Sequence, residues 1–352
     1  MNVDNPDAKS QSDSIRSALL HAVQRDDPSP VRSVALAFGV TRQAVNRHLS
    51  NLIAEGWIHA TGQTRNRRYE LRAASSDRFV LKLAEGLEED VIWREHVRPV
   101  VGDAPANVVG ICQYGLTGIV NNAIDHSNGT TLTIDVQRTA LDIVMQIADD
   151  GVGVFQKIRS AFQYADAQQA VLELSKGKLT TDRTRHSGEG LFFVSRVVDV
   201  FEICSDRLAF RHDTRQNQWD LNTADDCPRG TRITLVVAVD SQRSLQDVFD
   251  HFTSGADDYG FTRTQVPVFL AQYGDENLVS RSQARRLLLR LDLFSDILFD
   301  FQGVATIGQG FADEVFRVYQ RQHPDSVLNW AHVTSDIERM IRRARAGLAT
   351  GS

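Results

Sequence analysis

Four short strings of polar residues and glycines lie between residues 116 and 231, and together they could hold a phosphorylated ligand. In chain order they are residues 121–126 (NNAIDH), 149–153 (DDGVG), 188–191 (GEGL) and 230–231 (GT). The amide oxygen of Asn122 suits Mg²⁺, which prefers oxygen ligands. Each string is a weak signal alone, but four of them in this order indicate a nucleotide pocket.

Regular elements are predicted to position each string. Apolar residues at helical spacing predict a helix over residues 114–125, with Asn122 on its polar flank. The apolar run 143–147 predicts a buried strand that ends at Asp149. Gly151 and Gly153 would then allow a sharp turn, and the Asp149 carboxylate could accept a hydrogen bond from an exocyclic amine such as that of adenine.

The third and fourth strings are predicted to lie at the start of a helix and of a strand. Residues 188–191 open a helix that we expect to continue to residue 198, and its N-terminal amides could face a phosphate. Gly230 and Thr231 precede an alternating strand over residues 232–237. The four strings would therefore converge only if these elements pack against one another.

At these residues the chain resembles the Bergerat-type ATP-binding fold of histidine kinases, type II topoisomerases and anti-sigma-factor kinases. The resemblance covers roughly residues 79–239 and implies an α/β sandwich that binds ATP and Mg²⁺. It assigns Asn122 to the metal and Asp149 and Thr231 to adenine. The other ATP-binding residues that it implies are Gly151, Gly153, Lys178, Gly188, Gly190 and Leu191. It also makes residues 155–187 a mobile lid.

One departure from this family concerns catalysis. In the members that hydrolyse ATP, a glutamate one helical turn before the metal asparagine activates water, and here that position is Gly118. Two explanations stay open: a natural binder with little turnover, or a replaced base that leaves ATP bound. Glu189 is disfavoured as a substitute base because relatives turn that side chain toward solvent. Phosphotransfer through His96 or His126 is disfavoured because neither has a recognisable dimerisation helix pair around it.

Length and composition limit the possible classes of protein. A chain of 352 residues with 42% hydrophobic residues can form two or three domains, each with its own core. The net charge of -6 argues against a nucleic-acid-coating protein but permits a local basic patch. Cys112, Cys204 and Cys227 lie far apart, so we expect reduced thiols. No apolar run approaches the roughly 20 residues of a membrane span, so we expect a cytoplasmic protein without an anchor or signal peptide.

The N-terminal region predicts a winged helix-turn-helix domain over residues 13–74, after a disordered tail over residues 1–12. Asp13 can cap a first helix, residues 31–38 form a second, and Thr41 can cap a third over residues 42–55. Two strands at 57–60 and 68–71 then enclose a basic loop. This order resembles winged helix-turn-helix domains over roughly residues 14–71.

The basic and amide side chains of this domain predict contacts with DNA. Such side chains on a third helix suit the major groove, and arginines in a wing suit phosphates or the minor groove. A winged helix that docks on protein is the alternative. The predicted DNA-binding residues are Arg42, Gln43, Asn46 and Arg47 on the helix and Arg65, Arg67 and Arg68 in the wing.

The ATP-binding domain is assigned to residues 75–240. Its first stretch, residues 79–95, is predicted to be a helix with Leu83, Leu87, Val91 and Ile92 on one side. That helix could couple the DNA-binding domain to the ATP-binding domain, pair with a second subunit in a homodimer, or act as a spacer. Residues 241–259 are predicted to be a connector.

Residues 260–346 predict a small α/β domain. Strands at 266–270 and 297–301 alternate with helices at 282–291 and 311–320. Residues 300–304 (DFQGV) resemble the central strand and turn of STAS-like domains. Anti-sigma antagonists carry a phosphorylated serine at the start of the next helix, and Gln309, Gly310 and Phe311 stand there instead. We therefore expect docking, within the chain or with a protein partner, and not phospho-switching.

The sequence as a whole predicts a multidomain α+β protein with a winged helix, a Bergerat-type α/β sandwich and a STAS-like domain. The expected function is DNA-binding regulation in which ATP occupancy of the central domain controls the winged helix. The alternative is an ATPase or an anti-sigma-type serine kinase that acts on a protein partner. A scaffold that keeps ATP as a structural ligand is a third possibility.

Overall fold

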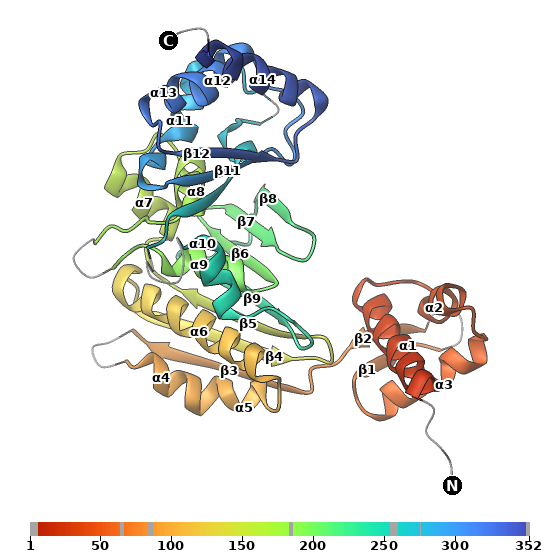
Figure 1. Ribbon diagram of the computed structural model, residues 1–352. Helices are drawn as coiled ribbons and strands as arrows, with labels where there is room; N and C mark the ends of the chain where they lie inside the picture. The colour runs from red at the N-terminus through yellow and green to blue at the C-terminus, as the bar shows by residue number, and fades with distance from the viewer. Residues whose placement is uncertain are drawn as a thin grey trace.

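The chain forms three parts in sequence order (Figure 1). The computed structural model describes residues 6–63, 67–83, 87–182, 186–253, 260–274 and 276–349. An N-terminal winged helix stands to one side of a central antiparallel sheet with helices, and a parallel α/β part follows at the C-terminal end (Figure 1). The predicted multidomain α+β architecture is confirmed at this level.

The winged helix has a hydrophobic core of its own. Thr41 caps the third helix, because its hydroxyl accepts a hydrogen bond of 3.2 Å from the backbone N–H of Ala44. The first helix begins at Pro6, earlier than the start at Asp13 that capping predicted. Leu19, Val45 and Leu52 are almost fully buried in the core. The elements are α1 (Pro6–Gln24), α2 (Pro30–Phe38), α3 (Arg42–Ala54) and the antiparallel strands β1 (Ile58–Thr61) and β2 (Arg68–Leu71).

The central part is built on a sheet of seven strands in the order β3-β4-β5-β9-β6-β7-β8, with every neighbouring pair antiparallel. Two helices, α6 (Ala106–His126) and α9 (Gly190–Val197), pack on the strands and on each other. The strands are β3 (Ser75–Lys82), β4 (Thr131–Arg138), β5 (Asp142–Asp149), β6 (Val200–Ser205), β7 (Leu208–Asp213), β8 (Gln218–Thr223) and β9 (Thr231–Ala238).

The predicted helix over residues 79–95 is wrong for its first part. Residues 75–82 form the edge strand β3, in which Phe79 pairs with Ile134 and Leu81 pairs with Leu132. The apolar residues that suggested one helix fall partly after the end of strand β3 and partly in α4. Their helical spacing therefore does not reflect one continuous helix. Residues 84–86 of the predicted helix lie outside the described residues. In the described remainder, helical structure starts at α4 (Glu89–Ile92) and continues through a π-helical turn (Trp93–Val97) into α5 (Arg98–Val101).

The C-terminal part is a three-stranded parallel sheet covered by helices. The strand predicted at 266–270 ends at Pro267, because proline has no backbone N–H for the ladder, and a 3-10 turn follows (Val268–Ala271). Its strands are β10 (Arg263–Pro267), β11 (Asp296–Asp300) and β12 (Val327–Ala331). Its helices are α11 (Arg281–Leu288), a continuous run of α12 (Gln309–Asp313), a π-helical segment (Glu314–Tyr319) and α13 (Gln320–Gln322), and α14 (Ser335–Ala349).

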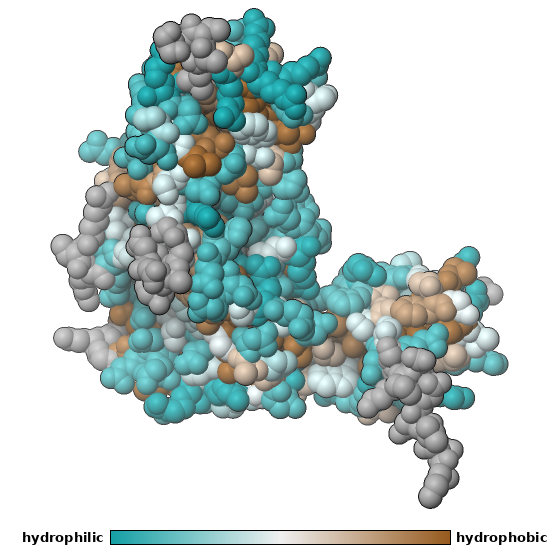
Figure 2. All heavy atoms as spheres, in the orientation of Figure 1, coloured by the Kyte–Doolittle hydropathy of each residue, from teal (hydrophilic) through white to brown (hydrophobic). Residues whose placement is uncertain are grey.

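Three further helices are α7 (Val154–Phe162), α8 (Ala167–Lys176) and α10 (Leu245–Phe252). Of these, α8 and α10 pack against β10 of the C-terminal part, and α7 packs against α8. One hydrophobic core runs through both parts, whereas the winged helix core is separate. The face drawn in Figure 2 is mainly hydrophilic over the central part, with hydrophobic patches on the two terminal parts. Within the described ranges, no helix is both long and apolar enough to cross a membrane.

Candidate functional site

A cavity of about 390 Å³ lies where α6, the end of β5, α7 and the start of α9 meet. Its volume is within the range of about 300–1,000 Å³ that is usual for ligand pockets. The fold brings together most of the predicted site residues, although they come from four separate stretches of chain. Those that line the cavity are Gly118, Asn122, Asp149, Gly153, Gly188, Gly190, Leu191 and Thr231.

Asp149 is the carboxylate at the inner end of the cavity. Its Oδ1 atom accepts hydrogen bonds from the backbone N–H groups of Gly151, at 2.9 Å, and Thr231, at 3.4 Å. Burial raises the pKa of Asp149, while these two hydrogen bonds act in the opposite direction. Ile147 and Ile233 form apolar walls beside it. The site therefore presents one oriented carboxylate in mainly apolar surroundings.

Glycines are required where three backbone segments meet beside Asp149. A Cβ atom at Gly151 would lie 2.1 Å from the carbonyl oxygen of Ser127, and one at Gly230 would lie 2.2 Å from that of Asp149. Gly153 has a φ of +85°, which disfavours residues with a side chain. Gly151 itself does not line the cavity. Its role is to let the turn after β5 pack closely against the end of α6.

The turn is also fixed by hydrogen bonds on its outer side. The Asp150 carboxylate accepts hydrogen bonds from the backbone N–H groups of Thr130, at 2.6 Å, and Thr131, at 2.9 Å. These bonds hold the pKa of Asp150 far below its usual range. On the inner side, the Thr231 hydroxyl accepts from the backbone N–H of Val154 at 3.0 Å. Thr231 therefore ties β9 to the start of α7.

The start of α9 forms the opposite wall of the cavity. Gly188, with a φ of +75°, packs against the backbone of Leu179, whose N–H donates to the Gly188 carbonyl at 3.2 Å. A Cβ atom at Gly190 would meet nothing within 4 Å. The two glycines therefore differ: Gly188 is needed for close packing, whereas Gly190 borders open space at the helix N-terminus.

Three cavity residues were not predicted as ligand contacts from the sequence. Lys157 on α7 lines the cavity, and its Nζ atom donates to the carbonyl of His126 at 2.6 Å. Burial lowers the pKa of Lys157. The rings of His126 and His186 lie edge to face at 4.6 Å. The position of Lys157, four residues after Gly153 on the helix that follows the turn, was the signal that could have identified it.

Lys178 was expected to contact ATP, but the structure does not bring it into the cavity. Its Nζ atom donates to the carbonyl of Leu293 at 2.9 Å and lies 4.9 Å from the centre of the Phe294 ring. A carbonyl and aromatic faces of the C-terminal part therefore hold this ammonium group. Lys157 is the lysine that lines the cavity.

Gly118 and Glu189 were the two positions considered for a general base. Gly118 borders the cavity, and a Cβ atom there would make an ordinary contact of 3.4 Å with Val194. A side chain can therefore start from this position. Glu189 is half-buried and does not line the cavity. Burial raises its pKa, and the nearby Lys178 opposes that shift.

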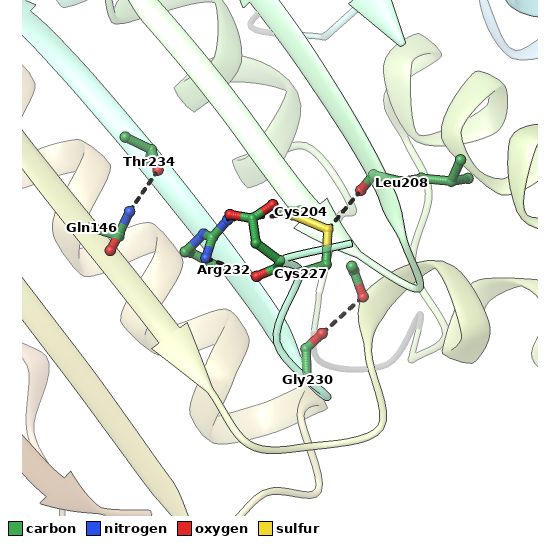
Figure 3. The surroundings of a disulfide bond; sticks show 9 residues. Gln146, Cys204, Leu208, Cys227, Gly230, Arg232 and Thr234 are labelled. Carbon is green, nitrogen blue, oxygen red and sulfur yellow. Dashed lines mark hydrogen bonds and ion pairs between the residues drawn. A yellow bond between two sulfur atoms is a disulfide. The ribbon is translucent and has the colours of Figure 1, made fainter. Parts of the chain in front are cut away.

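A disulfide joins Cys204 and Cys227 beside the site (Figure 3). The expectation of reduced thiols is wrong for these two cysteines, because β6 and the loop before β9 become neighbours only in the folded sheet. The disulfide closes the loop that leads to Gly230, whose carbonyl accepts from the Ser205 hydroxyl at 2.9 Å. Cys112 stays free and buried, and burial raises the pKa of its thiol to about 12.

The segment predicted as a mobile lid contains α7 and α8, and α8 is held by the C-terminal part. Glu173 on α8 accepts hydrogen bonds from Lys176, at 2.6 Å, and from Arg290, at 3.1 Å. The Lys176 ammonium also donates to the carbonyl of Leu289 at 2.8 Å. The side chains of Glu173 and Lys176 are fully buried, and burial lowers the pKa of Lys176 to about 8. Residues 183–185 of the predicted lid lie outside the described residues.

The predicted DNA-binding residues of the winged helix are exposed wherever the structure describes them. These are Arg42, Gln43, Asn46 and Arg47 on α3 and Arg67 and Arg68 at the wing. Arg65 lies outside the described residues. Elsewhere on this domain, Gln24 at the end of α1 donates a 2.5 Å hydrogen bond to Asp142 at the start of β5. The domain therefore touches the central sheet with a different surface from its basic one.

Comparison with known families identifies two of the three parts. Residues 12–59 match the winged helix-turn-helix DNA-binding family, and residues 283–338 match a STAS-like domain of unknown function. No curated protein matches the chain. Neither match covers the central sheet. The N-terminal part is therefore a winged helix-turn-helix, which suggests DNA binding, and the C-terminal part is STAS-like.

Proposed function

We propose that the central domain is a Bergerat-type module that binds ATP with Mg²⁺, and that its occupancy controls DNA binding by the winged helix. The observation that carries the proposal is the single cavity in which Asn122, Asp149, Gly188 and Thr231 meet from four separate stretches of chain. Chance motifs would have no reason to converge in this way.

The chemistry of the cavity fits such a ligand. The two backbone donors to Oδ1 of Asp149 orient the carboxylate, which leaves Oδ2 to accept from an exocyclic amine. The N-terminal end of α9 and Lys157 supply positive electrostatic potential for phosphates. Among the described residues no group of three or more His, Cys, Asp or Glu could hold a metal ion. Mg²⁺ would therefore depend on Asn122 together with phosphate oxygens.

Strand β5 offers a direct connection between the cavity and the winged helix. It ends at Asp149 in the cavity and begins at Asp142, whose carboxylate accepts from Gln24 of the winged helix and pairs with Arg215 at 3.3 Å. A ligand that displaces the Asp149 end of this strand would alter the Asp142 contact. Coupling of this kind requires that ATP affinity differ between two orientations of the winged helix.

Calorimetric titration of ATP and ADP with Mg²⁺ tests the binding site. Asp149→Asn should weaken both nucleotides by about 1–3 kcal/mol, the cost of a lost charge-assisted hydrogen bond. Asp135→Asn is the matched control, since Asp135 pairs with Arg78 on β3, outside the cavity. Asn122→Ala should instead reduce the Mg²⁺ dependence. Equal affinities for the parent and Asp149→Asn proteins would refute the adenine assignment.

DNA titrations over a range of salt concentrations test the proposed DNA binding by the winged helix. Alanine at Arg65, Arg67 and Arg68 should weaken binding to all sequences and flatten the salt dependence, whereas changes at Arg42 or Gln43 should relax sequence preference. ATP should shift the affinity for DNA of the parent protein, and Asp149→Asn should need a higher ATP concentration for the same shift, in proportion to its weaker ATP binding. An unaltered salt slope in the wing variant would favour a winged helix that docks on protein.

ATP hydrolysis, or serine phosphorylation of a protein partner, is the second candidate function. Gly118 disfavours it, because no side chain stands where relatives carry a base. The cavity wall has room for a side chain at Gly118, so the missing base can be restored. Gly118→Glu should raise the rate of ATP hydrolysis by about 10²–10⁴-fold, the usual contribution of a general base. Fast phosphate release by the parent protein that Asp149→Asn abolishes would instead establish an enzyme with another base.

A further inference from the structure

A second cavity, of about 460 Å³, lies where α9, the β7–β8 hairpin, α10 and β10 meet. It differs from the first cavity in that residues of both the central and the C-terminal parts line it. Two arginines and several neutral donors face it, and none of these residues has a role in the proposed ATP site. The polar lining of this cavity includes Arg196, Thr214, Asn217, Arg243, Asp247 and Gln265.

Arg196 is a buried cation with unused hydrogen-bonding capacity. Its side chain belongs to α9, its exposed fraction is 3%, and its guanidinium lies 4.6 Å from the Phe192 ring and 4.4 Å from the Trp219 ring. Nη2 reaches the carbonyls of Ser175 and Gln265 at the long distances of 3.3 and 3.4 Å. Within the described chain Nε has no hydrogen-bond partner. Burial lowers the pKa of Arg196 to about 9, which still leaves it charged near neutral pH.

Arg243 brings a second guanidinium to the same cavity. Its Nη2 atom donates to the backbone carbonyl of Arg196 at 2.6 Å, which fixes the two arginines relative to each other. Nε of Arg243 also lacks a partner among the described residues. A buried donor without an acceptor costs about 1–3 kcal/mol, so an acidic ligand that reached these two guanidinium groups would relieve that cost.

The other titratable side chains that line the cavity are His212, His251 and Asp247. Burial lowers the pKa of His212 to about 2, so this ring stays neutral, and its Nδ1 lies 2.9 Å from the carbonyl of Ser195. Asp247 accepts from the Ser244 hydroxyl at 2.6 Å. Asp300, which is near Arg196, accepts from Gln265 at 2.8 Å. The two arginines are therefore the groups best placed to attract a further ligand.

We propose that this cavity binds a small acidic ligand through a phosphate or carboxylate group, held by Arg196 and Arg243 between the central and STAS-like parts. Paired guanidinium groups match the geometry of such oxyanions. Asn217 adds an amide donor from the β7–β8 hairpin, and Gln265 adds the C-terminal wall. The Thr214 hydroxyl donates to the backbone carbonyls of Val198 and Asp199, so it lines the cavity without offering a free donor. The ligand would thus bridge two parts of the chain.

The position of this site predicts a link to the first cavity. Phe192 lines the first cavity, and its ring contacts the guanidinium of Arg196 at the second. Both residues lie on α9, whose N-terminal end faces the first cavity. A ligand at the arginines would therefore act on the helix that the two cavities share.

Calorimetry of the full chain at low ionic strength tests the proposal with two probes, inorganic phosphate and succinate. At least one probe should bind saturably, and the tighter one identifies the preferred oxyanion. Arg243→Gln should weaken that probe at least tenfold. Arg211→Gln is the matched control, because this partly buried arginine on β7 pairs with Glu202 outside the cavity, and its effect should stay within twofold.

The fluorescence of Trp219, which lies against Arg196, gives a second readout that does not depend on heat. The probe should change the emission of the parent protein, and Trp219→Phe should remove that change while calorimetric binding remains. The proposal fails if neither probe binds saturably, or if Arg243→Gln binds as tightly as the parent. Phosphate binding that survives Arg243→Gln and is displaced by ATP would place the anion in the first cavity and also overturn the proposal.

Discussion

The two terminal parts are attached to the central sheet in different ways. The STAS-like part shares one continuous core with the central part, and a fully buried ion pair, Glu173 with Lys176, is completed by Arg290 from the C-terminal side. The winged helix has its own core, against which Ala140 and Leu141 pack, and Gln24 forms a hydrogen bond to Asp142 of the central sheet.

This difference separates a fixed contact from an adjustable one. Separating the STAS-like part would expose a shared apolar core and charges that are buried in the folded chain, which is costly. Releasing the winged helix would expose much less, since its own core would remain intact. We therefore expect the central and STAS-like parts to unfold together, and the winged helix to change orientation at a small free-energy cost.

The largest expected effect comes from breaking the fixed contact. Glu173→Gln would leave the Lys176 ammonium buried beside Arg290 without its carboxylate, and loss of one partner of a buried ion pair typically costs about 3–5 kcal/mol. Denaturant unfolding should show this loss in the free energy of unfolding of the joint core. Glu338→Gln, which removes a surface pair with Arg342, should change it by less than about 1 kcal/mol. Equal effects of the two changes would refute a fixed attachment.

The disulfide is expected to have a somewhat smaller effect and to act within the central part alone. Opening the loop between Cys204 and Cys227 should lower the free energy of unfolding by roughly 3 kcal/mol, by the chain-entropy estimate. Cys227→Ser and treatment of the parent with dithiothreitol should give the same shift in thermal unfolding. The reductant should add nothing to Cys227→Ser. A further shift in that variant would mean that the reductant acts elsewhere.

A third test uses the pH dependence of Asp149 at the far end of β5 from the winged helix. Because burial raises its folded-state pKa, the native state holds the proton more tightly than the unfolded state. Its contribution favours folding below the unfolded pKa and is lost as pH rises through the folded pKa. Asp149→Asn should therefore raise the melting temperature of the ligand-free protein at neutral pH, and this gain should shrink below about pH 4. A lower melting temperature at neutral pH would contradict this.

The smallest expected effect comes from breaking the adjustable contact. Gln24→Ala removes the hydrogen bond to Asp142 and should cost about 0.5–1.5 kcal/mol, the usual net value of one such bond. Hydrogen exchange should accelerate where Asp142 begins β5, while exchange in the C-terminal sheet stays unchanged. Gln246→Ala, which breaks an exposed pair with Asp250 on α10, is the control. Faster exchange in the C-terminal sheet of Gln24→Ala would mean that the winged helix is also part of the joint core.

Local signals predicted the elements better than their partners. Thr41 before an apolar helical period located α3, and the apolar run before Asp149 located β5, because capping and side-chain periodicity act within a few residues. The same reasoning failed for residues 79–82. Their strand character depends on pairing with β4, which lies far along the chain.

In the candidate site, too, local sequence signals predicted some residues, whereas others depend on long-range packing. The four short strings and the family resemblance that they carry identified Asp149, Thr231 and most of the glycines that now border one cavity, since a turn that brings backbones together requires glycine wherever it occurs. Spacing could not show that Lys157 lines the cavity and Lys178 does not, because this depends on the hydrogen bond that holds the Lys178 ammonium to the C-terminal part. The second cavity could not be predicted from the sequence, because Arg196 and Arg243 come into contact only when α9 packs beside the segment that leads to α10.

The sequence by itself determined the three parts in order, several of the helices, half of the strands in the described chain, and the residue types at the first cavity. The reason is that helical period, strand alternation and turn chemistry are properties of short segments. Only the tertiary structure decided the pairing of Cys204 with Cys227, the burial of Glu173 with Lys176 and the contact of Gln24 with Asp142. The disulfide and the Gln24–Asp142 hydrogen bond join residues that are distant along the chain, and the ion pair is buried by a distant segment. Contacts and burial of this kind arise only when the chain folds.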